Sequence, residues 1–234
     1  MNSELSAFNR RVFSSRTFEA RESRLRKALA MLEREPRRGR LLDVAAGSGI
    51  AAEALAGQGW DVVATDLSED LVDQISARGV DARVHDLSSG PLPFEDASLE
   101  AVFAGEIIEH LIDTTAFLDE VRRVLGPGGI LVVTTPNLAS LENRLRLLMG
   151  RYPIWVEYAL GGQGHVRAYT LPTLRAHLIR CGFLVETIVG SWVPLLPQRW
   201  IDDVRLPALA RTGDWFPSLS QGLIARGRRY PESR

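Results

Sequence analysis

Short apolar segments alternate with helical patterns over the first 137 residues, and this alternation constrains the fold more than any other feature. The apolar segments lie at 40–46, 61–66, 81–86, 99–105 and 129–135, and each has the length of a buried strand. Strand, helix and strand at this spacing predict a parallel sheet with right-handed crossovers and helices on both faces.

The pattern changes after residue 137, but helical and strand segments continue. The segment TLPTLRAHLIRCG has Thr170 where a helix N-cap is expected and Gly182 just after its end. The expected elements outside the first alternation are helices at 16–35, 138–150 and 170–182, and strands at 183–190 and 219–227.

The chain is long enough for one well-buried α/β domain of 234 residues. It shows no internal repeat and no second independent core. We expect a single domain over 1–234, divided into an N-terminal helical segment (1–39), a cofactor-binding half (40–137), and two helical and aromatic insertions that cover the sheet (138–169 and 190–218).

Several classes of protein are disfavoured by simple counts. No run approaches the roughly 20 apolar residues that a membrane span needs. The N-terminus MNSELSAFNRRVF has no apolar core of signal-peptide length, so we expect a cytoplasmic protein. The single cysteine, Cys181, excludes an internal disulfide and a thiolate-rich metal site within one chain.

Charge is unevenly distributed, although the net charge is only −1. Residues 41–120 contain 17 acidic and 2 basic side chains, whereas residues 1–40 contain 11 basic and 5 acidic ones. The middle block therefore repels phosphates and favours a cationic ligand. The basic residues 1–40 lack interleaved aromatic residues, so we expect no nucleic-acid partner.

A glycine turn follows the first strand in the segment DVAAGSGIAAEAL. Gly47 and Gly49 begin a G-x-G-x-x-A pattern, and Asp66 ends the next strand, which is typical of a nucleotide site. A dinucleotide places its pyrophosphate at such a turn, but the carboxylates of Asp43, Asp86 and Glu106 disfavour phosphates. S-adenosylmethionine has a sulfonium, an ammonium and a ribose diol instead, and acidic strand ends suit those groups.

Four motifs in series resemble those of class I S-adenosylmethionine-dependent methyltransferases: DVAAGSG, VVATDLS, HDLSSGPLPFEDASLEAVFAGEIIEHL and LGPGGILVVTTPN. The resemblance is specific over 40–137 and looser over 170–228. It implies a Rossmann-like, doubly wound, seven-stranded sheet whose last strand is antiparallel. The chain departs from the family at Ala45, where glycine is usual, and we expect cofactor binding to survive with Ala45 at negative φ.

The resemblance also implies roles for residues at the strand ends. Gly47 and Gly49, with Ala45 beside them, are expected to line the methionine moiety, and Asp43 to anchor the turn or the amino group. Asp66 is expected to hold the ribose, Leu67, Asp86 and Leu87 to surround the adenine, and Glu106 to lie near the methyl group.

The stretch EIIEHL (106–111) contains the acids closest to that methyl group. In a helix, Glu106, Glu109 and His110 would share one face. Three interpretations of these residues stay open: a metal site, an acid–base cluster, or only an acidic helix start that suits the helix dipole. The run is similar to one in small-RNA 2′-O-methyltransferases and in quinone-biosynthesis O-methyltransferases, where His165 would complete the set.

Candidate catalytic residues are His165, His110 and Glu106, and no metal ligand is assigned. His165 lies in the glycine-rich stretch GGQGHVRAYT, where a mobile loop could bring a base over the methyl group. His85 and His177 are interpreted as packing or surface histidines. The aromatic residues of the insertions form either a small satellite core or a lid over the acceptor: Tyr152, Trp155, Tyr158, Trp192, Trp200 and Trp215.

The sequence thus predicts a methyltransferase that modifies a small molecule at oxygen, in glycan or secondary-metabolite metabolism. A nucleotide-dependent oxidoreductase of similar fold, an RNA 2′-O-methyltransferase and a cofactor-binding protein without turnover remain alternatives. The oligomeric state stays open.

Overall fold

The computed structural model describes residues 22–158, 164–195 and 206–230. A seven-stranded sheet runs through it in the order β3-β2-β1-β4-β5-β7-β6. The strands are β1 (Arg40–Val44), β2 (Asp61–Asp66), β3 (Asp81–Val84), β4 (Leu99–Gly105), β5 (Leu125–Pro136), β6 (Phe183–Gly190) and β7 (Gly222–Arg229). The helices are α2 (Ser23–Glu33), α3 (Ile50–Gly57), α4 (Glu69–Ser76), α5 (Thr114–Val124), α6 (Leu141–Leu148), α7 (Leu171–Arg180) and α8 (Ala210–Trp215), with 3₁₀ turns at Ile108–His110, Pro207–Leu209 and Pro217–Leu219.

The strand pairing confirms the predicted fold class. Strands β1 to β5 are parallel to one another, whereas β7 is antiparallel to both β5 and β6. From β1 the chain moves outward through β2 and β3, then returns to the other side of β1 with β4. This reversal is the switch point at which ligands of such sheets bind, at the carboxyl ends of the strands.

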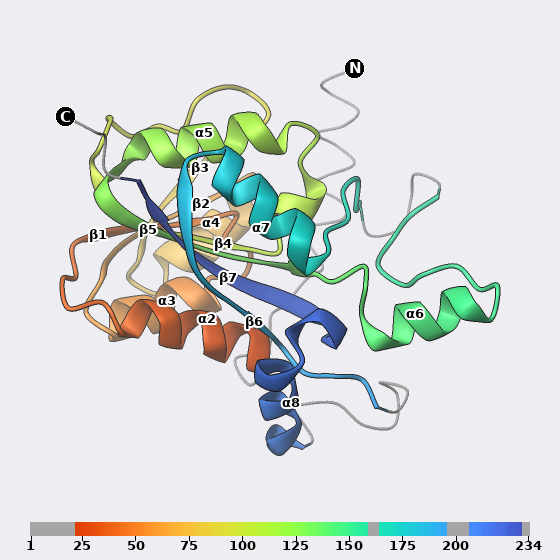
Figure 1. Cartoon of the computed structure of the whole chain (residues 1–234). Coiled ribbons are helices and arrows are strands. Elements are labelled where there is room, and N and C mark those ends of the chain that lie inside the picture. Colours follow the sequence, from red (N-terminus) through yellow and green to blue (C-terminus); the bar gives the residue numbers. More distant parts are fainter. Residues whose placement is uncertain (1–21, 159–163, 196–205, 231–234) are drawn as a thin grey trace.

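Helices cover both faces of the sheet, as Figure 1 shows with α5 and α7 on one side and α2 and α3 on the other. The first face packs a core around Leu118, Leu174 and Phe183, all fully buried. The second face packs Leu32 and Leu55 against the sheet. The central strands contribute to both cores because parallel strands are apolar on both faces.

Most predicted elements are present with shifted ends. The described part of the N-terminal helix begins at Ser23, and the rest of the predicted helix lies outside the described residues. Thr170 forms the predicted N-cap of α7, in a capping box with Thr173. Helix α6 is shorter than predicted because Ser140 caps its start by accepting the Asn143 N–H.

The expectation that EIIEHL lies on a helix is wrong. Glu106 has a left-handed backbone with φ of 53°, and its N–H donates to the Thr134 carbonyl, which continues the β4–β5 pairing. Only a short 3₁₀ turn follows at Ile108–His110. Helix α5 begins at Thr114, where the Asp113 side chain accepts the Ala116 N–H.

The aromatic residues of the insertions do not gather into one group within the described residues. Trp192 is buried beside the end of β6, whereas Trp215 on α8 is 66% exposed. Tyr152 and Tyr158 contact each other edge to face but are both exposed. Trp200 lies outside the described residues. In the described ranges, no helix is long and apolar enough to cross a membrane.

Candidate functional site

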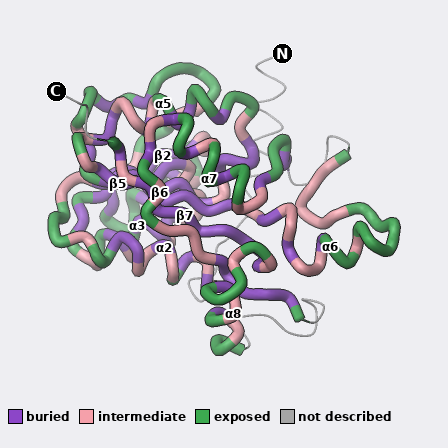
Figure 2. The backbone as a smooth tube through the Cα atoms, in the orientation of Figure 1, coloured by how far each residue is buried: buried purple, intermediate pink, exposed green. Residues whose placement is uncertain are grey.

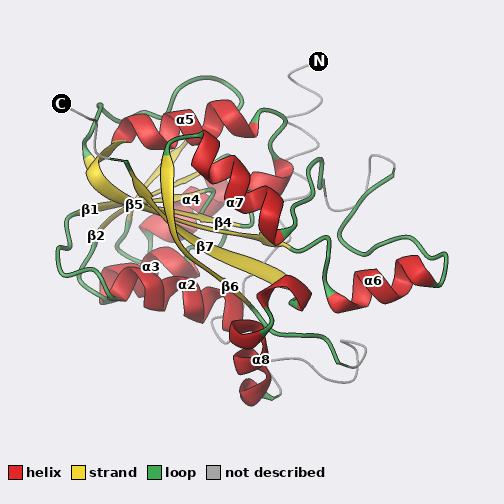
Figure 3. Ribbon diagram, viewed as in Figure 1, coloured by secondary structure: helices red, strands yellow, loops and turns green. Residues whose placement is uncertain are grey.

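Four polar residues lie at or next to the carboxyl ends of adjacent strands, which Figure 3 draws in yellow. Asp66 is the last residue of β2, and Asp43 is the last but one of β1. Glu106 follows β4, and Asn137 follows β5, where it is buried. Parallel pairing brings these ends to one edge of the sheet, and the part of these residues in cofactor binding stays a prediction.

The turn after β1 is built from left-handed residues. Gly47 and Gly49 have φ of 55° and 75°, and a Cβ on Gly49 would lie 2.7 Å from Cγ1 of Ile75. The Gly47 N–H donates to Oδ2 of Asp66 at 2.9 Å, which ties the turn to β2. Glycine is therefore required at position 49 both by its backbone and by its neighbour.

Ala45 corrects one expectation about this turn. Its φ is 55°, so the prediction of a negative φ is wrong. The next residue, Ala46, donates its N–H to the Thr65 carbonyl at 2.9 Å, and this bond holds the chain in the bend. An alanine in this region carries a strain of about 1 kcal/mol, which the fixed turn tolerates.

Asp43 and Asp66 form a buried acidic pair beneath the turn. Asp43 is 2% exposed; burial and then the Asp66 charge raise its pKa to about 8. Burial also raises the pKa of Asp66, although its Oδ1 accepts the Ser68 N–H. Oδ2 of Asp43 has no hydrogen-bond partner among the described residues. Such a pair is completed by a ligand that brings positive charge and hydroxyl donors.

Two apolar side chains and one further acid lie at the ends of β2 and β3. Leu67 and Leu87 are half-buried, which suits the faces of a planar group. The carboxylate of Asp86 accepts the backbone N–H and the hydroxyl of Ser88, at 2.8 and 2.6 Å. These bonds hold the Asp86 side chain in place, and its part in cofactor binding stays a prediction.

Glu106 contacts a residue that sequence reasoning missed. Its Oε2 forms an ion pair with Arg24 of α2 at 2.8 Å, and its Oε1 accepts a hydrogen bond from the Thr134 hydroxyl at 2.9 Å. Arg24 stood out in the sequence only as one of many basic residues before position 40. The Glu106 carboxylate is therefore engaged by Arg24, so Glu106 and Glu109 have different partners.

A buried cluster of Glu109, His110 and His165 lies on the other side of this stretch. One ligand atom from each residue lies within 4.8 Å of the others, and the imidazole centroids are 4.7 Å apart. Each Nδ1 faces a backbone carbonyl: His110 that of Gly164 at 3.1 Å, and His165 that of Trp155 at 2.8 Å. Because a carbonyl only accepts, Nδ1 carries a proton in both rings.

Glu109 joins the cluster to the segment that carries His165. Its carbonyl accepts the N–H groups of Val166 and Arg167, at 2.9 and 3.0 Å. Its Oε2 accepts the Thr135 hydroxyl, whereas Oε1 has no hydrogen-bond partner among the described residues. Burial, and then the Glu106 charge, raise the pKa of the Glu109 carboxyl well above its usual value.

A small pocket, open to solvent on one side, lies beside this cluster. Glu109 and His165 reach it from the sheet edge, and Leu138, Ile154 and Trp155 add apolar walls. His165 was expected on a mobile loop, yet it is only 6% exposed and packs against His110. The pocket therefore combines apolar walls with three polar residues, Glu109, His165 and Arg167.

The two remaining histidines lie outside this cluster. His177 on α7 stacks on Tyr169, bonds its hydroxyl at 3.1 Å and reaches Thr115 with the other nitrogen. His85 follows β3, and burial lowers its pKa. Neither lines the cavity.

The sheet order, the acidic strand ends and the glycine turn define a methyltransferase fold of the class that uses S-adenosylmethionine. The profile described as "Methyltransferase domain" matches residues 42–133. A ubiquinone biosynthesis O-methyltransferase of Xanthomonas axonopodis pv. citri is 31% identical over 185 residues, which are 74% of this chain and 72% of that protein. The chain therefore belongs to the S-adenosylmethionine-dependent methyltransferases, whose methyl donor is S-adenosylmethionine.

Two further comparisons define how far this likeness extends. A probable S-adenosylmethionine-dependent methyltransferase of Mycolicibacterium smegmatis is 39% identical over 152 residues, or 64% of this chain and 54% of that protein. The chain thus spans about half the length of this relative. A crystal structure from Thermotoga maritima, described as a possible histamine N-methyltransferase, covers 98% of this chain and 100% of its own, with a TM-score of 0.66 and 17% identity. That likeness shows the fold alone.

Proposed function

We propose that this protein transfers a methyl group from S-adenosylmethionine to a hydroxyl group of a small molecule. One observation carries the proposal: the His165 imidazole and the buried carboxyl of Glu109 line a pocket with apolar walls, beside the end of β5. A hydroxyl acceptor needs a group to take its proton, whereas an amine can react in its neutral form. The named O-methyltransferase relative supports the same choice.

The acidic pair supports the choice of cofactor. The carboxyl groups of Asp43 and Asp66 are unsuited to a pyrophosphate, because its phosphates would meet two buried acids at the turn. It suits the ammonium and the ribose hydroxyls of S-adenosylmethionine, which when bound supplies an activated methyl group. Within this proposal Gly47 and Gly49 let the cofactor approach the backbone, and Leu67 and Leu87 hold the adenine.

His165 is the proposed base. Its Nδ1–H is held by the Trp155 carbonyl, so Nε2 is the nitrogen that would take the acceptor's proton. Trp155 has a left-handed backbone with φ of 64°, and Ile154 and Val156 on either side of it line the cavity with it. The carbonyl that orients His165 therefore belongs to the wall that would hold the acceptor.

The first experiment tests cofactor and chemistry separately. Calorimetry with S-adenosylhomocysteine and with NAD⁺ should show binding of the first alone, and a preference for NAD⁺ would overturn the proposal. A panel of hydroxylated acceptors is then screened by release of S-adenosylhomocysteine. His165→Ala should lower turnover by about 10²-fold or more with unchanged cofactor affinity, whereas His177→Ala, the matched histidine outside the cavity, should not.

As the alternative to a histidine base, we propose that the Glu109, His110 and His165 cluster holds a divalent cation, which His165 would then bind instead of taking the acceptor's proton. One ligand atom from each of the three residues lies within 4.8 Å of the others, and backbone carbonyls hold both imidazoles, as outer partners of metal ligands do. Two nitrogens and one oxygen suit zinc, iron or manganese better than magnesium. Bound there, a cation would lower the pKa of the acceptor hydroxyl.

Metal binding is measured directly. Metal-stripped protein is titrated with Zn²⁺ and Mn²⁺, and the thermal midpoint and the bound metal are recorded. Glu109→Gln should abolish the rise in midpoint, whereas Glu142→Gln, on α6, should keep it. Equal responses of the two variants, or no binding, would retire the cation and leave His165 acting alone.

A further inference from the structure

Helix α6 projects from the body of the protein, as Figure 1 shows, and three of its four leucines are exposed. Leu145, Leu147 and Leu148 are 49%, 55% and 84% exposed, and Met149 just after the helix is 59% exposed. The fully buried residue of the helix is the polar Asn143. The orientation is the reverse of an ordinary surface helix, whose apolar stripe faces the core.

Hydrogen bonds explain the reversed orientation. The Asn143 amide donates to the Ile154 carbonyl at 3.2 Å, and its oxygen accepts the Ile154 N–H at 2.8 Å. These bonds fix the polar side of α6 against the segment that lines the cavity. Leu145 and Leu148 then lie about one turn apart on the outer side, where Figure 2 shows the tube mostly exposed.

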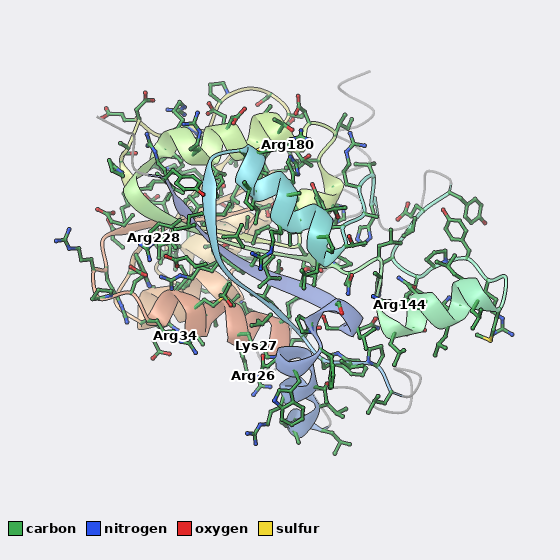
Figure 4. The ribbon with its side chains drawn as sticks, viewed as in Figure 1. Arg26, Lys27, Arg34, Arg144, Arg180 and Arg228 are labelled. Atoms are coloured by element: carbon green, nitrogen blue, oxygen red, sulfur yellow. The ribbon has the colours of Figure 1, made fainter. Side chains whose placement is uncertain are left out.

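Aromatic and basic side chains surround these leucines. Tyr152 and Tyr158 are 48% and 85% exposed and pack edge to face with centroids 5.3 Å apart. Tyrosine combines an apolar ring with a polar tip, which suits the boundary between lipid and water. Arg144, Arg146 and Arg151 belong to the same segment, and Figure 4 labels Arg144 on α6.

We propose that this surface, named the α6 patch, docks on an anionic lipid membrane. The α6 patch consists of Leu145, Leu147, Leu148, Met149, Tyr152 and Tyr158 with Arg144, Arg146 and Arg151. Exposed leucines enter the acyl boundary while arginines meet lipid phosphates, which is how amphipathic helices lie on membranes.

Charge favours lipid over a second copy of this chain. A two-fold dimer brings the same patch of both subunits together, so arginines would face arginines. The segment has three arginines and only two acids, Glu142 and Glu157. Its net positive charge therefore matches the anionic phosphates of lipids. Oε1 of Glu157 accepts the His165 N–H at 3.4 Å, whereas Arg144 and Arg146 donate to backbone carbonyls and so keep their charge.

Docking would place the cavity at the membrane surface. Ile154 is bonded to Asn143 of α6 and itself lines the cavity, so the patch and the cavity share one segment. This step rests on the proposed function: the acceptor would then be an apolar molecule that reaches the cavity from the lipid phase.

The experiment measures co-sedimentation of the full chain with vesicles, without cofactor. Vesicles of phosphatidylcholine alone are compared with vesicles containing about a third phosphatidylglycerol. The chain should bind the anionic vesicles, and binding should weaken with added salt. The double variant Leu145→Ser and Leu148→Ser should lower the partition coefficient by about tenfold or more.

A matched pair elsewhere controls for lost hydrophobicity. Ile179 on α7 and Leu184 on β6 are both 47% exposed, and their double change to serine should leave binding intact. Thermal midpoints of both variants show that they fold. No binding to anionic vesicles, or equal losses in both pairs, would overturn the proposal.

A dimer would be seen by sedimentation equilibrium. A concentration-dependent mass that disappears in the α6 variant would replace the membrane by a second copy. Because no cofactor or acceptor is present, any of these failures leaves the proposed methyl transfer standing. Conversely, loss of methyl transfer in His165→Ala leaves vesicle binding unchanged.

Discussion

Replacing Asp43 by asparagine should remove a large pH dependence of stability. The carboxyl pKa is raised from 3.8 to about 8, chiefly by burial and then by Asp66. Above pH 4 the unfolded chain has lost this proton while the folded chain keeps it. A group whose pKa is raised on folding contributes stability below its unfolded pKa, and that contribution is lost as pH rises toward the folded pKa.

The magnitude follows from the size of the shift. Each pH unit inside the window between about 4 and 8 costs about 1.4 kcal/mol. From pH 5 to pH 7 the Asp43 carboxyl therefore lowers the free energy of unfolding by about 3 kcal/mol. Asparagine does not ionise, so Asp43→Asn should be the more stable protein at pH 7, and the difference should shrink toward pH 5.

Urea unfolding of both proteins at pH 5, 6 and 7 provides the measurement. The difference between the two free energies isolates this carboxyl from other titrating groups. Parallel pH profiles would refute the reasoning, because they would mean that Asp43 is ionised in the folded state. Calorimetry adds a second check: a cationic cofactor should release a proton on binding to the natural protein and none on binding to the variant.

Three further changes test the turn and the packing of α2. Ala45→Gly should raise the free energy of unfolding by about 0.5 kcal/mol, because it relieves a left-handed alanine. The control Ala56→Gly, in α3, should lower it by about 1 kcal/mol. A lower urea midpoint in both variants would contradict this. Gly49→Ala should lower the affinity for S-adenosylhomocysteine, because its Cβ would lie 2.7 Å from an α4 side chain; unchanged calorimetric affinity would count against it. Lys27→Met should lower the free energy of unfolding by about 2 kcal/mol, because the Lys27 ammonium donates to the Gly190 and Ala210 carbonyls and to Asp214. Figure 4 labels Lys27 and its exposed neighbour Arg26, and Arg26→Met is the control. Equal thermal midpoints of the two variants would refute this role of Lys27.

The sheet and its ligand edge were predictable because their signals are local and repeated. The strands β2, β4 and β6 begin and end at the predicted residues, since each is an apolar run bounded by charged residues or glycine. Parallel topology then brings their carboxyl ends together without further information. For this reason the placement of Asp66 and of the glycine turn followed from order and spacing alone.

The parts that were not predictable depend on contacts between distant segments. Arg24 reaches Glu106 across 82 positions, and no pattern in either segment reports that pair. His165 is held down because the Glu109 carbonyl bonds the two residues after it. The exposed leucines of α6 matched a helical pattern, but only the bonds of Asn143 to Ile154 decide which side faces outward.

The stretch EIIEHL shows why a motif does not transfer as a unit. A helix would have placed Glu106 and Glu109 side by side, as a shared ligand set needs. The left-handed Glu106 instead turns the chain, so its carboxylate bonds Arg24 and Thr134 while Glu109 faces His110 and the cavity. The two acids are thereby divided between tasks: one ties α2 to the sheet edge, and the other remains buried without a partner for Oε1 among the described residues. The proposed cation would therefore be bound by Glu109, His110 and His165, without Glu106. For this reason Glu106→Gln should weaken the contact of the sheet edge with α2 far more than it weakens metal binding.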